Sequence, residues 1–271
     1  MSHAGFQVRK LEKNDAGGHS LAVAAGLHGV YVQNALAVGQ HDGLVFVLDG
    51  VECGLAWFGP RGNLVLLADE RLGGLQQQIT EQIRASRLAW RIVLGPAAVV
   101  DALAVGLARP PLAHRNQIYY VGGPEDAPKA LVRDDMRLPV REDRERLARS
   151  TLALNASDLN IAPARVDRRW LYRMIDERIE DGSTRVLGPI GDMWSKLDYG
   201  TDGPGGAVLE GVFTFPDRRG RGLGAELVAT CMAAATLPVS LHVAEHNRAA
   251  RSVYERAGMR EAASCRLLLL N

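Results

Sequence analysis

Short apolar runs separated by turn residues fill the first half of the chain. Runs of this length with few polar interruptions predict strands, and apolar residues at helical spacing predict helices between them. Asp49-Gly50 and Gly59-Pro60 mark the turns between the first three runs. The expected elements are strands over 44–49, 51–58 and 63–69, a helix over 72–85, a strand over 90–95, a helix over 96–108 and a strand over 117–121.

The second half repeats this order after a segment rich in Gly, Pro and acidic residues. Leu131-Val132-Arg133 precedes a charged helical opening much as Gln7-Val8-Arg9 does, which is typical of a duplicated domain. We therefore predict two similar α/β domains, 1–123 and 130–271, joined by a linker at 124–129. The expected elements of the second are helices over 142–155, 166–179, 222–235 and 248–257 and strands over 185–188, 193–198, 206–214, 239–244 and 264–270.

Composition restricts the class of protein. The 271 residues carry a formal charge of +1, which provides no global attraction to nucleic acid, and 47% of them are hydrophobic, as in a globular protein. Cys53, Cys231 and Cys265 lie too far apart for a disulfide framework or a metal site, so we expect a reducing cytoplasm and no metal. The polar start of the chain and the interrupted apolar stretch 21–38 predict neither export nor a membrane span.

Residues 207–224, AVLEGVFTFPDRRGRGLG, combine an apolar strand with arginines and glycines directly before a helix. Glycines let a backbone approach an anion, and a helix N-terminus adds N–H groups and a positive end. The segment therefore predicts a phosphate cradle in which Arg218, Arg219 and Arg221 supply charge, although a solvated turn is the alternative. A P-loop ending and the acidic residue of a dinucleotide fold are both missing, which argues against NTP and NAD chemistry.

A second segment, 239–259, reads as a strand, an Asn247 suited to cap a helix, and an amphipathic helix that ends at Gly258. Together the two segments resemble the GNAT acetyltransferase superfamily. Arg219, Gly222 and Gly224 match its acetyl-CoA signature of Arg or Gln followed by x-x-G-x-G/A. A second pattern, N-x-x-A-x-x-x-Y-x-x-x-G-F, is matched by Asn247, Ala250, Tyr254 and Gly258, with Met259 where Phe is usual.

The resemblance implies an α/β (α+β) fold of two tandem GNAT-like domains, each a mixed, mostly antiparallel sheet flanked by helices, as in tandem bacterial members. It also implies acetyl-CoA as cosubstrate, held by the loop and by a strand that parts from its neighbour. Arg248 and Arg251 either reach the 3′-phosphate of CoA or face solvent. The implied cofactor-binding residues are Val212, Phe213, Thr214, Arg218, Arg219, Gly220, Arg221, Gly222, Leu223, Gly224, Ala225, Asn247 and Ala250.

In that family the matched tyrosine, here Tyr254, protonates the departing CoA sulfur, a role that suits a phenol at neutral pH. An amine acceptor needs a base. His242 lies on the strand before Asn247, and Glu210 lies on the cradle strand, where alternation places it on one face with Val212 and Thr214. Each is also an ordinary strand histidine or surface carboxylate in the simpler interpretation.

The first half lacks these signals. Asp69 and Glu70 stand where a phosphate would approach, and the helix expected over 96–108 contains no tyrosine. We interpret this half as a degenerate GNAT-like domain without cofactor binding. It would wall off the acceptor site, bind a second ligand, or replace a dimer partner.

The resemblance therefore predicts a cytoplasmic N-acetyltransferase, of EC 2.3.1 type, that moves an acetyl group to a primary amine by direct attack. The expected partner is a small-molecule or peptide amine, with no nucleic acid and no membrane, and the protein is expected to be a monomer or a homodimer. A non-catalytic acyl-CoA sensor is the alternative. An enzyme that makes a small thiol or transfers a longer acyl group is a third possibility.

Overall fold

The computed structural model describes residues 5–60, 62–105 and 107–270, and the chain forms two compact units. Unit 1 contains the chain up to Ile118 together with Gly203–Gly205 and the C-terminal residues from Ala263. Unit 2 contains Tyr119–Asp202 and Gly206–Ala262. Each unit therefore combines segments that are far apart in the sequence.

Unit 1 is built on a mixed sheet with the strand order β1-β2-β3-β4-β5-β11. All neighbouring strands in it are antiparallel except β4 and β5, which are parallel. Its elements are β1 (Phe6–Lys10), α1 (Ala16–Ala24), α2 (Val30–Ala37), β2 (Gly43–Leu48), β3 (Val51–Phe58), β4 (Asn63–Ala68), α3 (Gln76–Ala85), β5 (Ile92–Gly95), α4 (Ala97–Val105) and the greater part of β11 (Arg260–Leu269).

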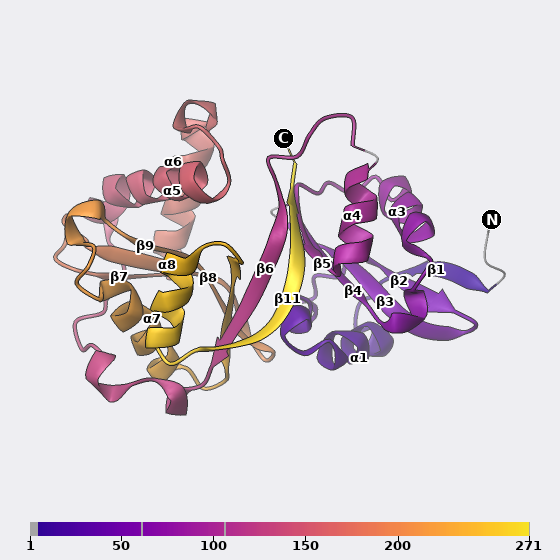
Figure 1. Cartoon of the computed structure of the whole chain (residues 1–271), viewed down its shortest axis with the longest axis horizontal. Helices are drawn as coiled ribbons and strands as arrows, with labels where there is room; N and C mark the ends of the chain where they lie inside the picture. Colours follow the sequence, from indigo (N-terminus) through magenta and orange to yellow (C-terminus); the bar gives the residue numbers. More distant parts are fainter. Residues whose placement is uncertain (1–4, 61, 106, 271) are drawn as a thin grey trace. The chain divides into compact units, whose positions relative to one another are not determined.

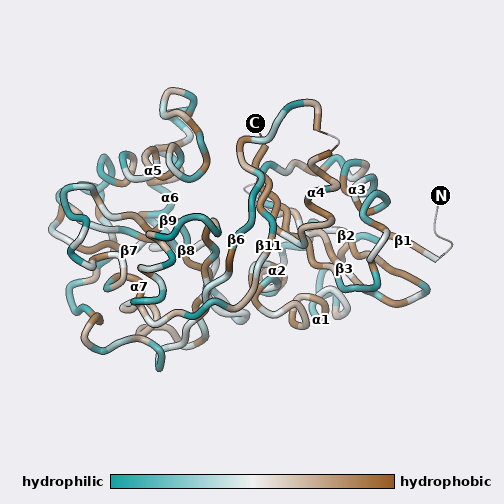
Figure 2. Tube along the Cα trace, viewed as in Figure 1, coloured by the Kyte–Doolittle hydropathy of each residue, from teal (hydrophilic) through white to brown (hydrophobic). Residues whose placement is uncertain are grey.

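Helices cover both faces of this sheet: α3 and α4 lie on one side and α1 on the other (Figure 1). Strands covered on both faces are apolar along their whole length. This explains the hydrophobic run of β4, NLVLLA, and Figure 2 shows hydrophobic residues, in brown, in the strands of this sheet. Leu64, Leu66, Ile79, Ile83 and Leu103 belong to the core between the sheet and the helices α3 and α4.

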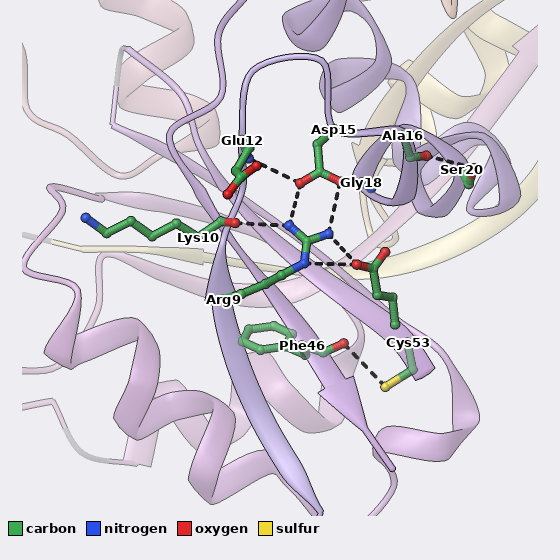
Figure 3. A network of polar contacts seen from close by, with 10 residues as sticks. Arg9, Lys10, Glu12, Asp15, Ala16, Gly18, Ser20, Phe46 and Cys53 are labelled. Carbon is green, nitrogen blue, oxygen red and sulfur yellow. Dashed lines mark hydrogen bonds and ion pairs between the residues drawn. The ribbon is translucent and has the colours of Figure 1, made fainter. Parts of the chain in front are cut away.

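A carboxylate begins α1 (Figure 3). Asp15 accepts a hydrogen bond from the Gly18 N–H (2.8 Å) and another from Arg9 Nη2 (3.0 Å), while Arg9 Nε donates to Glu52 on β3 (2.9 Å). These bonds satisfy an N–H of the first helical turn and tie α1 to the sheet. The hydrogen bond from Arg9, helped by the backbone N–H groups, holds the pKa of Asp15 well below its usual range although burial opposes this.

The strands of unit 2 are ordered β7-β8-β9-β10-β6. The β7 and β8 strands are antiparallel, and β9 and β10 are parallel. Its elements are the end of β6 (Ala113–Gly122), α5 (Arg144–Asp158), α6 (Arg168–Glu180), β7 (Thr184–Leu187), β8 (Ser195–Gly203), β9 (Gly206–Thr214), α7 (Leu223–Ala234), β10 (Val239–Ala244) and α8 (Arg248–Arg256).

Helices α5 and α6 cover one face of this sheet, and α7 lies on the other (Figure 1). Leu147, Leu171, Ile175 and Phe213 are buried in the core under α5 and α6. Helix α7 is buried from Leu223 to Met232 except at Glu226, which explains its lack of a polar face. The predicted α/β class, with a mixed sheet and flanking helices in each half, is confirmed.

The units divide the chain differently from the boundaries expected at 123 and 130. The last strand pairs with unit 1, because Leu267 of β11 lies opposite Leu94 of β5. The segment expected as a linker, 124–129, belongs to unit 2 and forms two short 3-10 turns. In the first of them Asp126 accepts the Gly123 N–H (2.8 Å), and the carbonyl of Asp126 closely approaches Gly258.

Most expected elements are present with shifted ends. The helix expected from residue 72 begins at Gln76, because Asp69 first caps a 3-10 turn at Glu70–Leu72. The strand expected over 193–198 runs from Ser195 to Gly203. No helix in the described residues is long and apolar enough to cross a membrane. Within the same residues, no group of three or more His, Cys, Asp and Glu side chains is arranged to hold a metal ion.

Candidate active site

The parallel strands β9 and β10 of unit 2 separate soon after they meet. Ala207 pairs with Val239 and Val208 with Ser240, and no further pair joins the two strands in the described residues. Strand β9 nevertheless continues to Thr214 and β10 to Ala244. The backbone of β9 beyond Val208 therefore lies along a gap in the β9·β10 ladder.

Gly211 lies in the separated part of β9 with a φ of +56°. A Cβ atom there would stand 2.8 Å from Lys196 Nζ and 2.9 Å from Asp198 Oδ2, so only glycine leaves room for this buried ion pair. Arg178 of α6 also binds Asp198, and Thr184 Oγ1 donates to it (2.7 Å). Burial raises the pKa of Asp198, but Lys196 and Arg178 outweigh this and hold the pKa below its ordinary value.

The charge of Glu210 acts on the buried charged cluster around Asp198. Burial lowers the pKa of the Arg178 guanidinium, but Asp198 and Glu210 outweigh it, which places Glu210 beside this charged cluster. Thr214 Oγ1 lies 3.5 Å from the Cβ position of Gly224 at the start of α7.

The loop after β9 presents a row of open backbone amides. Gly220 and Gly222 have φ values of +75° and +85°, and α7 begins at Leu223. Among the described residues, the N–H groups from Gly220 to Gly224 have no hydrogen-bond acceptor. Successive N–H groups in such a turn, at a helix N-terminus, form an anion-binding nest.

Other expected cofactor residues already have partners within the protein. The Ala225 N–H donates to the Gly222 carbonyl (2.9 Å), and the Ala250 N–H donates to Asn247 Oδ1 (3.1 Å), which caps α8. On β9, the Phe213 carbonyl accepts from Ser195 Oγ (2.8 Å) and the Thr214 carbonyl accepts from Arg219 Nε (3.1 Å). The Phe213 side chain is in the core, and Val212 is half-buried.

The three loop arginines differ in their partners. Arg218 donates to Asp192 (3.0 Å) and lies over the Trp194 ring, and Arg219 is bound to the Thr214 carbonyl. Arg221 is exposed and makes no side-chain contact to another described residue. Arg256 of α8, which the sequence pattern did not single out, lies with its Nη2 only 3.0 Å from the Cβ position of Gly222.

Tyr254 is buried on α8, and its hydroxyl makes no hydrogen bond to another described residue. Its ring contacts Tyr120 at a centroid distance of 5.8 Å. Burial, together with the negative charge of Asp158 at the end of α5, raises its pKa well above the ordinary value, so the phenol stays protonated at neutral pH. Sequence motifs gave no indication of Asp158, which comes from a distant helix.

His242 is half-buried on β10, and its ring meets Tyr119 edge-on at 5.8 Å. Tyr119 and Tyr120 are consecutive on β6 and point to opposite faces of the sheet. Because Tyr120 contacts Tyr254, His242 and Tyr254 lie on opposite sides of the strand. Arg251, considered for the 3′-phosphate, instead binds the Tyr120 hydroxyl (3.1 Å) and Glu261 (3.1 Å).

Residues 170–259 match the family model described as acetyltransferase (GNAT) family. The similarity to this family thus lies in the second half of the chain. The matched residues include the separated strands, the open amides and Tyr254. Members of this family are acetyltransferases, so the family indicates an acyltransferase. No curated protein matches the sequence.

Solved structures resemble the whole chain. A GNAT acetyltransferase from Colwellia psychrerythraea is 14% identical, with 98% of this chain and 100% of that one covered and a TM-score of 0.53. A GCN5-related N-acetyltransferase from Sphaerobacter thermophilus is 17% identical (97% and 94% covered, TM-score 0.56). A tandem GNAT protein from the clavulanic acid biosynthesis pathway is 15% identical (97% of both chains covered, TM-score 0.50). The fold of two tandem GNAT-like domains is therefore confirmed.

Proposed function

We propose that the protein is an acetyl-CoA-dependent N-acetyltransferase whose reaction takes place in unit 2. The open amides from Gly220 to Gly224, at the end of a strand that separates from its neighbour, carry this proposal. They offer hydrogen-bond donors and a positive helix end to a diphosphate, and the protein supplies no acceptor of its own there within the described residues. Acetyl-CoA would contribute the acetyl thioester that an amine attacks.

The separated strands provide the remaining contacts in this proposal. Backbone groups of β9 that have no partner on β10 would hold the extended arm of the cosubstrate, with Val212 lining it and the Phe213 and Thr214 side chains fixed by their packing. Val253 of α8 and Thr214 lie against Gly224, at 3.3 and 3.5 Å from its Cβ position, and keep the loop beside β9. A side chain at residue 224 would press on both.

Tyr254 is proposed as the general acid. Its hydroxyl proton has no acceptor among the described residues, and the raised pKa keeps the phenol protonated until a thiolate forms beside it. Proton transfer from the tyrosine Oη to sulfur then makes CoA a neutral leaving group. Tyr120, whose hydroxyl donates to Glu255 (2.7 Å), has no such free proton.

We assign the general base to His242 and keep Glu210 as its competitor. Imidazole accepts a proton near neutral pH, and His242 lies on the side of the sheet opposite to Tyr254, so the acceptor amine and the leaving sulfur would have separate proton partners. Glu210 lies beside the cations Arg178 and Lys196. Comparing the pH–rate profiles of His242→Gln and Glu210→Gln separates the two, because only loss of the true base removes the limb in which activity rises with pH.

Calorimetric titration of acetyl-CoA tests cosubstrate binding. Gly220→Asp places a carboxylate in the amide row, and Gly39→Asp is a matched control, because both glycines have a positive φ (+75° and +77°) and nothing within 4 Å of the Cβ position. We expect the wild type and Gly39→Asp to bind equally and Gly220→Asp to bind about 100-fold more weakly, since like charges brought together cost several kcal/mol. Equal binding by all three proteins would contradict the proposed site.

Thiol release measured with a panel of amines tests catalysis. The panel contains a peptide N-terminus, lysine, a polyamine, an aminosugar and an amino acid. We expect acetyl-CoA consumption with at least one of them, and loss of turnover in Tyr254→Phe. Binding of acetyl-CoA without thiol release from any amine would favour the non-catalytic sensor instead.

A further inference from the structure

Arg256, the last residue of α8, brings an unpaired cation to the open loop. Its side chain is exposed, and its Nη2, Cζ and Nη1 atoms lie 3.0, 3.3 and 3.4 Å from the Cβ position of Gly222. It makes no hydrogen bond or ion pair with another described residue. The guanidinium therefore stands beside the backbone of the amide row with its donors unused.

Three neighbouring arginines are engaged within the protein, whereas Arg221 of the loop, like Arg256, has no hydrogen-bond or ion-pair partner among the described residues. Arg218 binds Asp192, Arg219 binds the Thr214 carbonyl, and Arg251 binds Tyr120 and Glu261. Arg256 thus differs from these three both in its position against Gly222 and in its lack of a partner among the described residues.

The carboxylates closest in sequence to Arg256 and to the loop also bind other residues. Glu255 accepts the Tyr120 hydroxyl (2.7 Å), and Glu226 in the first turn of α7 pairs with Arg133 (2.9 Å). The loop therefore combines the guanidinium groups of Arg221 and Arg256, open N–H groups and the positive end of α7, and no described carboxylate pairs with any of them. Groups of one sign held this close are repulsive unless an anion lies between them.

We propose that Arg256 is a direct ligand of the diphosphate of acetyl-CoA, an inference that rests on the proposed function. Gly222 contributes its own N–H to the amide row, so an anion bound to that row lies within reach of the guanidinium packed against Gly222. A guanidinium binds phosphate oxygens through two parallel N–H donors. With this contact, recognition of acetyl-CoA would depend on its diphosphate and not only on the extended arm that carries the thioester.

The test compares acetyl-CoA with acetyl-dephospho-CoA, which keeps the diphosphate and lacks the 3′-phosphate. We expect Arg256→Gln to weaken binding of both ligands by the same factor, about tenfold for a lost charge-assisted pair, and Arg256→Lys to recover part of the loss. Arg173→Gln is the matched control, because Arg173 is also exposed, helical and without a side-chain partner among the described residues. Its affinity for both ligands should equal that of the wild type.

Each alternative outcome overturns a different statement. Weaker binding of acetyl-CoA alone would move the contact of Arg256 to the 3′-phosphate and refute its role at the diphosphate. Unchanged affinity of Arg256→Gln for both ligands, with normal binding by the wild type, would refute the contact while leaving the proposed function intact. No binding of acetyl-CoA by the wild type would refute the proposed function, and the role of Arg256 with it.

Discussion

The loops that follow β4 in unit 1 and β9 in unit 2 occupy the same place in two similar folds, but their backbone amides are bonded differently. In unit 1 the Asp69 carboxylate accepts the Arg71 N–H (2.8 Å) and binds the Arg71 side chain, and the Gly73 N–H donates to the Glu70 carbonyl (2.9 Å). In unit 2 the N–H groups from Gly220 to Gly224 find no acceptor in the described residues. The N–H groups of Arg71 and Gly73 are therefore not available to an anion.

The strands beside these loops also differ, because those of unit 1 stay together and those of unit 2 separate. Strand β5 stays against β4 from Ile92 to Leu94, and Gly95 then packs onto Leu66, whose Cβ is 2.6 Å from the Cβ position of Gly95. Strands β9 and β10 separate after two pairs and continue apart. A binding surface of this kind thus needs both a loop with open amides and strands that leave their ladder.

The largest expected effect tests which loop binds acetyl-CoA. Gly74 of unit 1, like Gly220, has a positive φ (+86°) and open space at its Cβ position. Calorimetry should find one acetyl-CoA bound per chain in the wild type and in Gly74→Asp, and none in Gly220→Asp at the same concentrations. A stoichiometry of two that falls to one in Gly74→Asp would remove the distinction between the loops.

A fully buried carboxylate anchors unit 2. Asp143 is bound by Arg137 Nη1 (2.7 Å) and by the N–H groups of Val140 (2.9 Å) and Gly191 (3.0 Å). Asp143→Ala would leave the guanidinium and two amides without their partner, so we expect urea denaturation to show a loss of about 3 kcal/mol. A stability loss no greater than that of Asp15→Ala in unit 1 would contradict the large contribution expected of a buried carboxylate.

The pH dependence of this loss has a definite sign. Burial raises the pKa of Asp143, but Arg137 and the backbone N–H groups outweigh it and lower the pKa. The contribution is therefore fully present above the ordinary aspartate pKa of about 4 and disappears as the pH falls through the lowered value. The wild type and the variant should differ equally at neutral and mildly acidic pH and converge only in strong acid.

Two neighbouring tyrosines test the catalytic assignment. Tyr254→Phe should lower kcat about 100-fold, equivalent to about 2.7 kcal/mol, because a positioned general acid typically contributes this much. Tyr120→Phe removes a hydroxyl bound to Glu255 and Arg251 in the same ring pair and should leave kcat unchanged. Similar losses in the two variants would assign the effect to packing and not to proton transfer.

The smallest expected effect concerns the hydrogen-bond network of Arg9, Asp15 and Glu52 in unit 1. Asp15→Ala should lower the stability of unit 1 by about 1 kcal/mol, the usual value of an N-cap, since Arg9 keeps Glu52 as a partner. Because Arg9 and the backbone lower the pKa of Asp15, this contribution is also lost only as the solution becomes strongly acidic. Thermal unfolding at neutral pH measures it, and acetyl-CoA affinity should not change.

Most elements of the fold were predictable, because apolar runs and glycine or proline turns are local signals. Strands β2, β3 and β9 and helices α3, α7 and α8 lie where those signals place them. The segment 124–129, expected as a linker, contains the 3-10 turn Pro124–Asp126, since glycine and proline mark such a turn as readily as a flexible connection. The membership of β11 in unit 1 depends on pairing with β5, which no local pattern records.

The candidate site was predicted where motifs are contiguous and missed where they are not. Arg219, Gly222, Gly224 and Tyr254 lie within two short segments and could be read from spacing alone. Arg256 and Asp158 could not, because their significance comes from proximity to Gly222 and to Tyr254 and not from neighbours in the chain.

The sequence by itself determined the α/β class, the duplication and the GNAT resemblance of the second half, because hydrophobic periodicity, glycines and motif spacing act over a few residues. The tertiary structure alone decided which amides stay open, which arginines are already paired and where the strands separate. These properties depend on whether a partner from another element reaches a given atom. Only the folded arrangement of the whole unit establishes that.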